Sequence, residues 1–236
     1  MSMGWAVVTG GAKRLGKAIA LELARAGYDL VIHFNTSQAD ADRTVAEIGG
    51  LGRQAWAISA DLRDPAAIDG LFAAIKRRCG TLRVLVNSAA DFPRNRVGSI
   101  TVEDWDAVMD LNLRAPFFCA QHAAGLMEAG GVIVNLADVG GEIPWPSYVP
   151  YGVSKAGILM LTKSLAVALA PGIRVGGVAP GAALMPDDWA GGEPIARVPL
   201  ARVGTAEDIA QAVRFIVEAP YLTGETIFVD GGRRWG

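Results

Sequence analysis

The chain has 236 residues with 22 basic and 24 acidic side chains, and 51% of its residues are hydrophobic. A chain of this length can bury one substantial core, so we expect a single domain over residues 1–236. The balanced charge excludes the basic surplus that neutralises nucleic-acid phosphates, and no nucleic-acid partner is expected.

The two cysteines, Cys79 and Cys119, lack the spacing of metal ligands and cannot form a disulfide framework, which fits a reducing compartment. We expect no metal site. No apolar stretch reaches the roughly 18 to 20 uncharged residues of a membrane helix, and no secretion signal precedes the first apolar run. A cytoplasmic protein without a membrane partner is the expectation.

Short apolar runs alternate with helical patterns from end to end. In chain order, strand 5–8 precedes helix 15–26, strand 30–34 precedes helix 38–48, strand 54–59 precedes helix 65–77, and strand 84–87 precedes a long helix from about 101 to 127. Strand 132–136, helix 151–169, strand 174–178, a helix capped at Thr205 and strand 226–229 complete the series. The alternation predicts an α/β fold, a doubly wound parallel sheet of seven strands with helices on both faces.

The connection from Pro180 to Pro199 is rich in glycine and proline and too long for a minimal loop. It has two interpretations. One is a mobile loop over the substrate, near residues 182–200, and the other is an ordinary irregular connection.

A glycine-rich segment, residues 9–16 (TGGAKRLG), lies between the first predicted strand and the first predicted helix. Exposed amide hydrogens and the helix dipole attract a pyrophosphate at such a junction, and glycines let a nucleotide approach the backbone closely. The position of the segment in a βαβ unit therefore predicts a dinucleotide site.

The end of the second predicted strand distinguishes the two nicotinamide dinucleotides. A carboxylate there binds a free ribose hydroxyl, but residues 33–37 (HFNTS) contain none. Nothing in that segment repels a ribose phosphate, and Arg14 adds positive charge nearby. We expect NADPH to be preferred; the alternative is that Asn35, Thr36 and Ser37 only cap the following helix.

Tyr151 and Lys155 are four residues apart at the start of a predicted helix, so they share one helix face. At about 4 Å and an effective dielectric near 20, an ammonium favours a phenolate by about 4 kcal/mol, which lowers the pKa of the phenol toward neutrality. Tyrosine then becomes a usable acid and base. Because the pair follows the fifth strand, we expect it at the C-terminal end of the sheet, where ligands bind.

Together these motifs resemble the short-chain dehydrogenase/reductase family, which has a Rossmann-type fold. The resemblance covers nearly the whole chain, including a closing Val-Asp-Gly-Gly at 229–232. It implies catalytic roles for Tyr151, Lys155 and Asn112. The residues that it implies at the cofactor are Gly10, Arg14, Leu15, Gly16, Asn35, Thr36, Ser37, Asp61, Leu62, Asn87, Ala89, Lys155, Pro180 and Gly181.

The family carries a serine 13 residues before its tyrosine, whereas this sequence has Asp138. An aspartate there is similar to the pteridine reductase branch, and so are Arg14 in place of a glycine, Phe92 after the fourth strand, and Tyr148. That resemblance implies substrate contacts from Phe92, Tyr148, Asp138 and Tyr151. Phe92 is expected to offer a ring face opposite the nicotinamide.

The function expected from this resemblance is NADPH-dependent reduction of a dihydropterin or a dihydrofolate-like substrate. Hydride passes from the nicotinamide to a ring carbon, and Tyr151 delivers a proton to the adjacent nitrogen. Lys155 binds the nicotinamide ribose and lowers the pKa of Tyr151, while Asp138 and Asn112 support proton supply. The structural alternatives are a loop anchor for Phe92, packing for Tyr148, and a cap or ion-pair partner for Asp138.

Two other functions fit parts of the same pattern. A carbonyl reductase of 3-oxoacyl thioesters or small ketones is the main alternative, and Asp138 in place of serine argues against it. A non-catalytic dinucleotide sensor is the other, but a sensor has no need of Tyr151 and Lys155. His33 and His122 are interpreted as structural or surface histidines.

The family resemblance also implies a homotetramer formed through the fourth and fifth helices, where Gly157, Ala166 and Ala168 would permit close packing. The C-terminal residues 233–235 (RRW) are candidates for contact with a neighbouring subunit's site. Three departures weaken the resemblance: Gly176 replaces an asparagine, residues 182–183 lack a hydroxyl, and Thr36 stands where a basic phosphate-binding side chain is expected.

Overall fold

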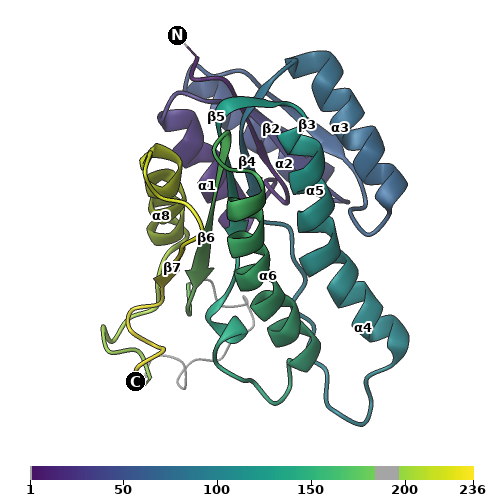
Figure 1. Ribbon diagram of the computed structural model, residues 1–236, viewed down its shortest axis with the longest axis vertical. Coiled ribbons are helices and arrows are strands. Elements are labelled where there is room, and N and C mark those ends of the chain that lie inside the picture. The colour runs from purple at the N-terminus through teal and green to yellow at the C-terminus, as the bar shows by residue number, and fades with distance from the viewer. Residues whose placement is uncertain (1, 184–196) are drawn as a thin grey trace.

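Seven apolar runs form one parallel sheet in the computed structural model, which describes residues 2–183 and 197–236 (Figure 1). The strand order is β3-β2-β1-β4-β5-β6-β7. The predicted doubly wound α/β fold is therefore confirmed. The strands are β1 (Trp5–Val8), β2 (Asp29–Phe34), β3 (Ala55–Ser59), β4 (Leu82–Asn87), β5 (Met127–Leu136), β6 (Ile173–Pro180) and β7 (Thr226–Val229).

Helices cover both faces of this sheet. The described helices are α1 (Arg14–Arg25), α2 (Gln38–Gly50), α3 (Pro65–Cys79), α4 (Val102–Met109), η1 (Asp110–Arg114), α5 (Ala115–Ala124), η2 (Val139–Gly141), α6 (Val149–Ala168) and α8 (Ala206–Glu218). Helices α1, α2 and α8 share one apolar core with the sheet, and α3, α5 and α6 share the other. Within residues 2–183 and 197–236, no helix is long and apolar enough to cross a membrane, and no three His, Cys, Asp or Glu side chains are grouped to hold a metal ion.

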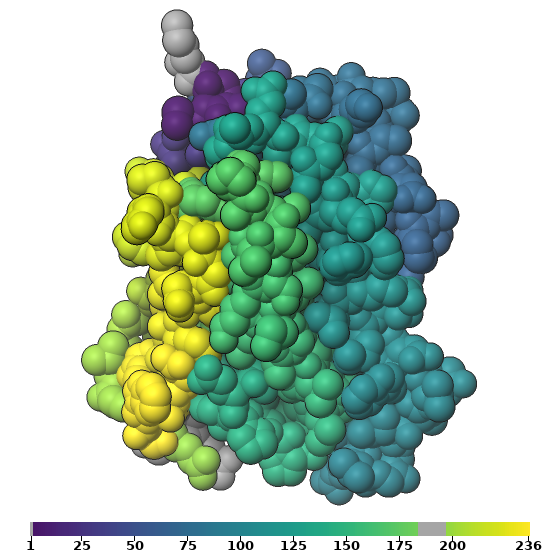
Figure 2. All heavy atoms as spheres, in the orientation of Figure 1, coloured from purple at the N-terminus to yellow at the C-terminus, as the bar shows by residue number. Residues whose placement is uncertain are grey.

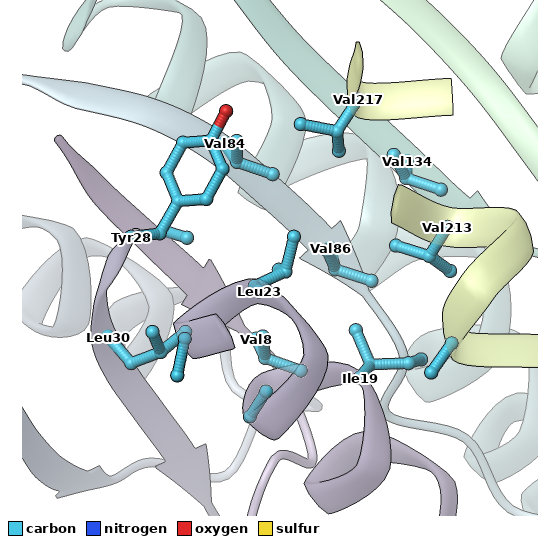
Figure 3. Packing of buried hydrophobic residues seen from close by; sticks show 14 of the residues in the cluster. Val8, Ile19, Leu23, Tyr28, Leu30, Val84, Val86, Val134, Val213 and Val217 are labelled. Carbon is cyan, nitrogen blue, oxygen red and sulfur yellow. The ribbon is translucent and has the colours of Figure 1, made fainter. Parts of the chain in front are cut away.

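The core between α1, α8 and the sheet shows how apolar patterning positions the first helix. Ile19 and Leu23 project from α1 toward the sheet and meet Val213 and Val217 of α8 (Figure 3). Burying each such side chain contributes about 1.5–3 kcal/mol, so the face of α1 that carries them is fixed against the strands. The start of α1 is thereby held at the C-terminal end of β1.

The predicted long helix over 101–127 is divided into three pieces, which corrects that prediction. Its start is confirmed, because Thr101 and Asp104 form a reciprocal capping box. A π-helical segment, η1, then interrupts the α-helix before Pro116. Pro116 has no amide hydrogen to donate to the carbonyl of Asn112, so the chain widens at this point instead of continuing as an α-helix.

The parallel strands all end at one edge of the sheet, which is the lower edge in Figure 1. The glycine-rich segment after β1, the turn after β5, the start of α6 and the C-terminus meet at that edge. Most of the predicted substrate loop near 182–200, namely residues 184–196, lies outside the described residues. The edge is where ligands bind in folds of this kind.

Candidate active site

A cavity of about 420 Å³ opens at the C-terminal ends of β1 to β4. Its size lies within the range of about 300–1,000 Å³ that is typical of small-molecule sites. Ten of the residues predicted at the cofactor line it: Gly10, Arg14, Leu15, Gly16, Asn35, Thr36, Ser37, Asp61, Leu62 and Ala89. Four others, namely Asn87, Lys155, Pro180 and Gly181, are not part of its lining.

The glycine-rich segment is packed too closely for side chains. A Cβ atom on Gly16 would lie 2.1 Å from the carbonyl oxygen of Gly10, and Gly10 itself has a φ of 64°. Arg14 also adopts a left-handed conformation, with a φ of 51°, although it is not a glycine. Such strain in a non-glycine residue costs about 1–3 kcal/mol and is commonest at functional sites. The N-cap residue of α1, Lys13, makes no side-chain capping hydrogen bond.

Thr9 fixes the segment after β4 against the glycine-rich segment. Its Oγ1 accepts hydrogen bonds from the amides of Ser88 at 2.9 Å and Ala89 at 3.1 Å. Two walls of the cavity are therefore joined by one buried hydroxyl. This contact could not be predicted from the glycine-rich motif, because only the tertiary structure brings residues 9 and 88–89 together.

Of the four remaining predicted cofactor residues, Asn87, Pro180 and Gly181 lie at strand ends and Lys155 lies on α6. Asn87 ends β4, and its Nδ2 donates to the carbonyl of Pro116 at 3.1 Å and to Asn135 Oδ1 at 2.9 Å. Its own Oδ1 is buried without a partner in the described part of the chain. Pro180 ends β6, and a Cβ on Gly181 would lie 2.7 Å from the Cα of Asp230, so this turn requires glycine.

Tyr151, Lys155 and Asp138 meet where β5 ends and α6 begins. The Lys155 Nζ donates to the carbonyl oxygen of Leu136 at 2.7 Å and lies 5.7 Å from the centre of the Tyr151 ring. The Tyr151 hydroxyl hydrogen-bonds to the Asp138 carboxyl. Asp138 Oδ1 also accepts from the amide of Gly140 at 2.7 Å, so it caps η2 as well as facing Tyr151.

Burial sets the protonation of these three groups. It raises the pKa of the Asp138 carboxyl and lowers the pKa of the Lys155 ammonium to about 8, with the charge of Asp138 opposing that fall. Burial, followed by the charge of Asp138, raises the pKa of Tyr151 well above its usual value. This corrects the expectation that Lys155 lowers the pKa of Tyr151. The charge that acts on the phenol is that of Asp138, and a negative charge favours a protonated phenol.

Asn112 lies in the π-helical segment, and both polar atoms of its side chain are hydrogen-bonded. Its Oδ1 accepts from the amide of Asp91 at 2.9 Å, and its Nδ2 donates to the Asp91 carbonyl at 2.9 Å and to Ser154 Oγ at 3.3 Å. Ser154 Oγ in turn donates to the Tyr151 carbonyl at 2.7 Å. Asn112 therefore holds the segment after β4 against α6. No motif in the sequence indicates this role for Ser154.

Three aromatic rings, those of Phe92, Tyr148 and Trp145, cluster around Tyr151. Phe92 stacks on Tyr148 with centroids 4.2 Å apart and meets the Tyr151 ring edge-on at 4.5 Å. Trp145, which the sequence analysis missed, lies parallel to the Tyr151 ring at 6.4 Å. Phe92 remains 46% exposed, whereas Tyr151 is only 7% exposed. One face of Phe92 is thus occupied by Tyr148, and the predicted substrate contact of this ring stays a prediction.

The C-terminal residues return to the same site in their own chain. The Arg233 guanidinium lies over the Trp145 ring at 5.4 Å. Arg234 lies over the ring of Phe228 and pairs with Glu142 at 3.1 Å. The tail therefore packs beside the aromatic cluster of the chain to which it belongs, and its predicted contact with a neighbouring subunit stays a prediction.

Comparisons with known proteins extend over almost the entire chain. A family model described as enoyl-(acyl carrier protein) reductase matches residues 10–234. The 3-oxoacyl-[acyl-carrier-protein] reductase FabG of Staphylococcus aureus is 37% identical over 96% of both chains, and 3beta-hydroxysteroid dehydrogenase 1 of Eggerthella lenta is 36% identical over 96% of this chain and 92% of that one. A crystal structure of a short chain dehydrogenase from Burkholderia cenocepacia in complex with NADP matches with a TM-score of 0.94 and 34% identity, over 99% of this chain and 98% of that one. These matches do not support the resemblance to pteridine reductases.

Proposed function

The chain belongs to the short-chain dehydrogenase/reductase family, and on that premise we propose that it reduces the carbonyl group of a 3-oxoacyl thioester or a ketone with NADPH. This is the alternative function of the sequence analysis, and it replaces pterin reduction. The relatives named above support it, because one acts on a 3-oxoacyl thioester and another is a hydroxysteroid dehydrogenase. The observation that carries the proposal is the contact of Tyr151 with Asp138 beside the buried Lys155.

The cavity fits a phosphorylated dinucleotide. The start of α1, which has no side-chain cap, and the left-handed Arg14 lie at the cavity. Side chains at Gly10 and Gly16 would collide with neighbouring backbone atoms, so the backbone there stays open to a ligand. Asn35, Thr36 and Ser37 line the same cavity after β2, and none of them is a carboxylate. A ribose phosphate meets no repulsion there, which supports NADPH over NADH. When bound, NADPH supplies the hydride that the carbonyl carbon accepts.

Tyr151 is in the protonation state that reduction requires. Its raised pKa keeps the phenol protonated at neutral pH, so it can donate a proton to the carbonyl oxygen as negative charge develops there. The Asp138 carboxyl accepts the phenol hydrogen bond, and its raised pKa lets it pass a proton back to Tyr151. Lys155, held by the Leu136 carbonyl, places a positive charge beside the ring.

Asp138 is compatible with carbonyl reduction, although the sequence analysis counted it against that function. A serine at this position would donate a hydrogen bond to a substrate carbonyl. A carboxyl whose pKa is raised by burial carries a proton over a wider pH range than an exposed one and can donate in the same way. The departure from serine therefore changes the proton source without removing the donor.

A substrate panel tests the proposal. Purified protein is assayed for NADPH oxidation with acetoacetyl-CoA as a 3-oxoacyl thioester, a set of aliphatic and cyclic ketones, and dihydrobiopterin. We expect turnover of at least one carbonyl substrate and a stoichiometric alcohol product. Oxidation of NADPH with dihydrobiopterin alone would overturn the proposal in favour of pterin reduction.

We also propose that the chain forms a homotetramer through α5 and α6, which occupy the face turned to the viewer in Figure 2. Met160 and Val167 of α6 are 61% and 82% exposed, as expected of an apolar contact surface. Gly157 and Ala166, in contrast, face their own chain, because a Cβ on Gly157 would lie 2.8 Å from Leu113 and Ala166 is buried. Light scattering that gives the mass of a monomer would contradict this assembly.

A further inference from the structure

His33 is a buried titratable side chain at the cofactor cavity that the proposed chemistry does not use. It lies next to the end of β2, pairs in register with Ile58 of β3, and is only 2% exposed. It also lines the cavity beside Gly10. From the sequence alone, His33 is interpreted as a structural or surface histidine.

The two ring nitrogens of His33 have fixed roles. Nδ1 lies 3.1 Å from the amide nitrogen of Gly10, and Nε2 lies 3.0 Å from the carbonyl oxygen of Ala60. An amide can only donate and a carbonyl can only accept, so Nδ1 must be unprotonated and Nε2 must carry the hydrogen. A proton on Nδ1 would set two donors against each other. The arrangement therefore requires a neutral imidazole.

If the hydrogen bond from the Gly10 amide to His33 is lost, Gly10 cannot move without displacing its neighbours. The carbonyl oxygen of His33 accepts from the amide of Gly11 at 2.9 Å, so one residue of β2 holds two consecutive amides of the glycine-rich segment. On the other sides, the Cβ position of Gly10 is 3.0 Å from Ala89 Cα, and the carbonyl of Gly10 lies against Gly16. A shift at Gly10 is transmitted to the start of α1 and to the segment after β4.

We propose that His33 is a positioning residue for the cofactor: its neutral ring holds the Gly10 amide in the shape that receives NADPH, and protonation of the ring releases the glycine-rich segment and weakens NADPH binding in acid. The proposal rests on the proposed function, because it presumes that this cavity receives NADPH. It adds a pH-dependent control of cofactor affinity to that function.

The charges around His33 confine the effect to acidic pH. Burial lowers the pKa of the imidazole, and the charge of Asp61 opposes that fall. The other charged side chains that line the same cavity are Lys13, Arg14, Arg63 and Asp91. Arg63 is paired with both Asp61 and Asp91, which reduces the negative potential that would favour an imidazolium. The ring is therefore neutral at neutral pH and becomes protonated only as the pH falls below the ordinary range of histidine.

Two substitutions separate the hydrogen bond from the titration. His33→Asn places Oδ1 where Nδ1 was, so it keeps an acceptor for the Gly10 amide that cannot be protonated. His33→Leu removes the acceptor and leaves the half-buried amide of Gly10 unpaired. His122→Asn is the matched control, because His122 stacks on Phe72 and pairs with Asp69 at α3, away from the cavity.

The experiment measures the Kd of NADPH by fluorescence titration from about pH 5 to about pH 8. The wild type and His122→Asn are expected to lose affinity at the acid end, whereas His33→Asn stays flat. His33→Leu is expected to bind about tenfold more weakly at neutral pH. Nitrogen-15 NMR of the His33 ring in the cofactor-free protein is expected to show the Nε2–H form at neutral pH.

The outcomes distinguish this inference from the proposed function. A wild-type protein that does not bind NADPH at any pH overturns both. If the wild type binds NADPH but His33→Asn loses affinity in acid just as the wild type does, the positioning role alone is overturned. If His33→Leu does not fold, the comparison of His33→Asn with the wild type still decides the question.

Discussion

The cofactor half and the catalytic half of the sheet edge are built in opposite ways. At the ends of β1 to β4, backbone amides and neutral or charged side chains border an open cavity of about 420 Å³. At the ends of β5 and α6, the titratable groups Asp138, Tyr151 and Lys155 are packed beneath aromatic rings. The first half is a shaped space that recognises charge, whereas the second half is a desolvated cluster in which burial controls protons. Substitutions in the two halves should therefore alter different kinetic constants.

Tyr151→Phe should separate the halves most clearly. Removing the hydroxyl takes away the proton donor, so kcat is expected to fall by about a thousandfold. The Kd of NADPH should stay within about twofold, because the ring and its neighbours remain. Tyr221→Phe, at a fully exposed tyrosine, is the matched control and should leave both constants unchanged. Near-normal turnover of Tyr151→Phe would remove the phenol from the mechanism.

Asp138→Asn should lower kcat by about ten- to a hundredfold without weakening NADPH binding. Asparagine can still cap η2 by accepting from the Gly140 amide, but it holds no exchangeable acid proton for Tyr151. Asp138→Ser, which restores the residue typical of the family, should retain more activity on ketones than Asp138→Asn. Equal kcat values for all three proteins would show that Asp138 only caps the turn.

Asn35→Asp changes the cavity at the ends of β1 to β4. A carboxylate after β2 would repel a ribose phosphate in the cavity, so kcat/KM for NADPH should fall about tenfold while that for NADH rises or holds. Asn35→Ser, which adds no charge, should keep the wild-type ratio. The measurement is the ratio of kcat/KM for the two cofactors. An unchanged ratio in Asn35→Asp would mean that the phosphate does not lie near β2.

The pH profile of kcat gives the smallest effect, a few-fold decline above about pH 8. Burial lowers the pKa of Lys155 to about 8, so its ammonium is present below that pH and is lost as the pH rises through it. Because the charge of Asp138 opposes this lowering, Asp138→Asn should move the decline to a lower pH. A profile that stays flat to pH 10 in both proteins would contradict a role for the charge of Lys155.

The sequence predicted the sheet and the place of the glycine-rich segment because both depend on local order. β1 and β7 have the predicted bounds, and the segment between β1 and α1 lies at the cavity as expected. Contacts made by tertiary packing were not predictable in this way. Thr9 and His33 bond to segments that follow other strands, and no sequence motif indicates those contacts.

The pKa shifts of the side chains around Tyr151 could not be predicted from the sequence either. Spacing alone placed Tyr151 and Lys155 together, but the direction of the Tyr151 pKa depends on burial and on Asp138, which only the fold reveals. The substrate expectation rested on a few matching positions, namely Arg14, Phe92, Asp138 and Tyr148. Whole-chain similarity to carbonyl-reducing relatives replaced it.

The wide turn of η1 constrains the number of residues in this part of the chain. In a π-helix each amide bonds five residues back, so η1 accommodates one residue more than an α-helix would over the same rise. Deleting one residue there would close the wide turn into an ordinary α-helical turn, so the residues within η1 would shift while α4 and α5 keep their phase. The carboxamide of Asn112 would then leave either the Asp91 backbone or Ser154. The length of this stretch is therefore as constrained as its side chains.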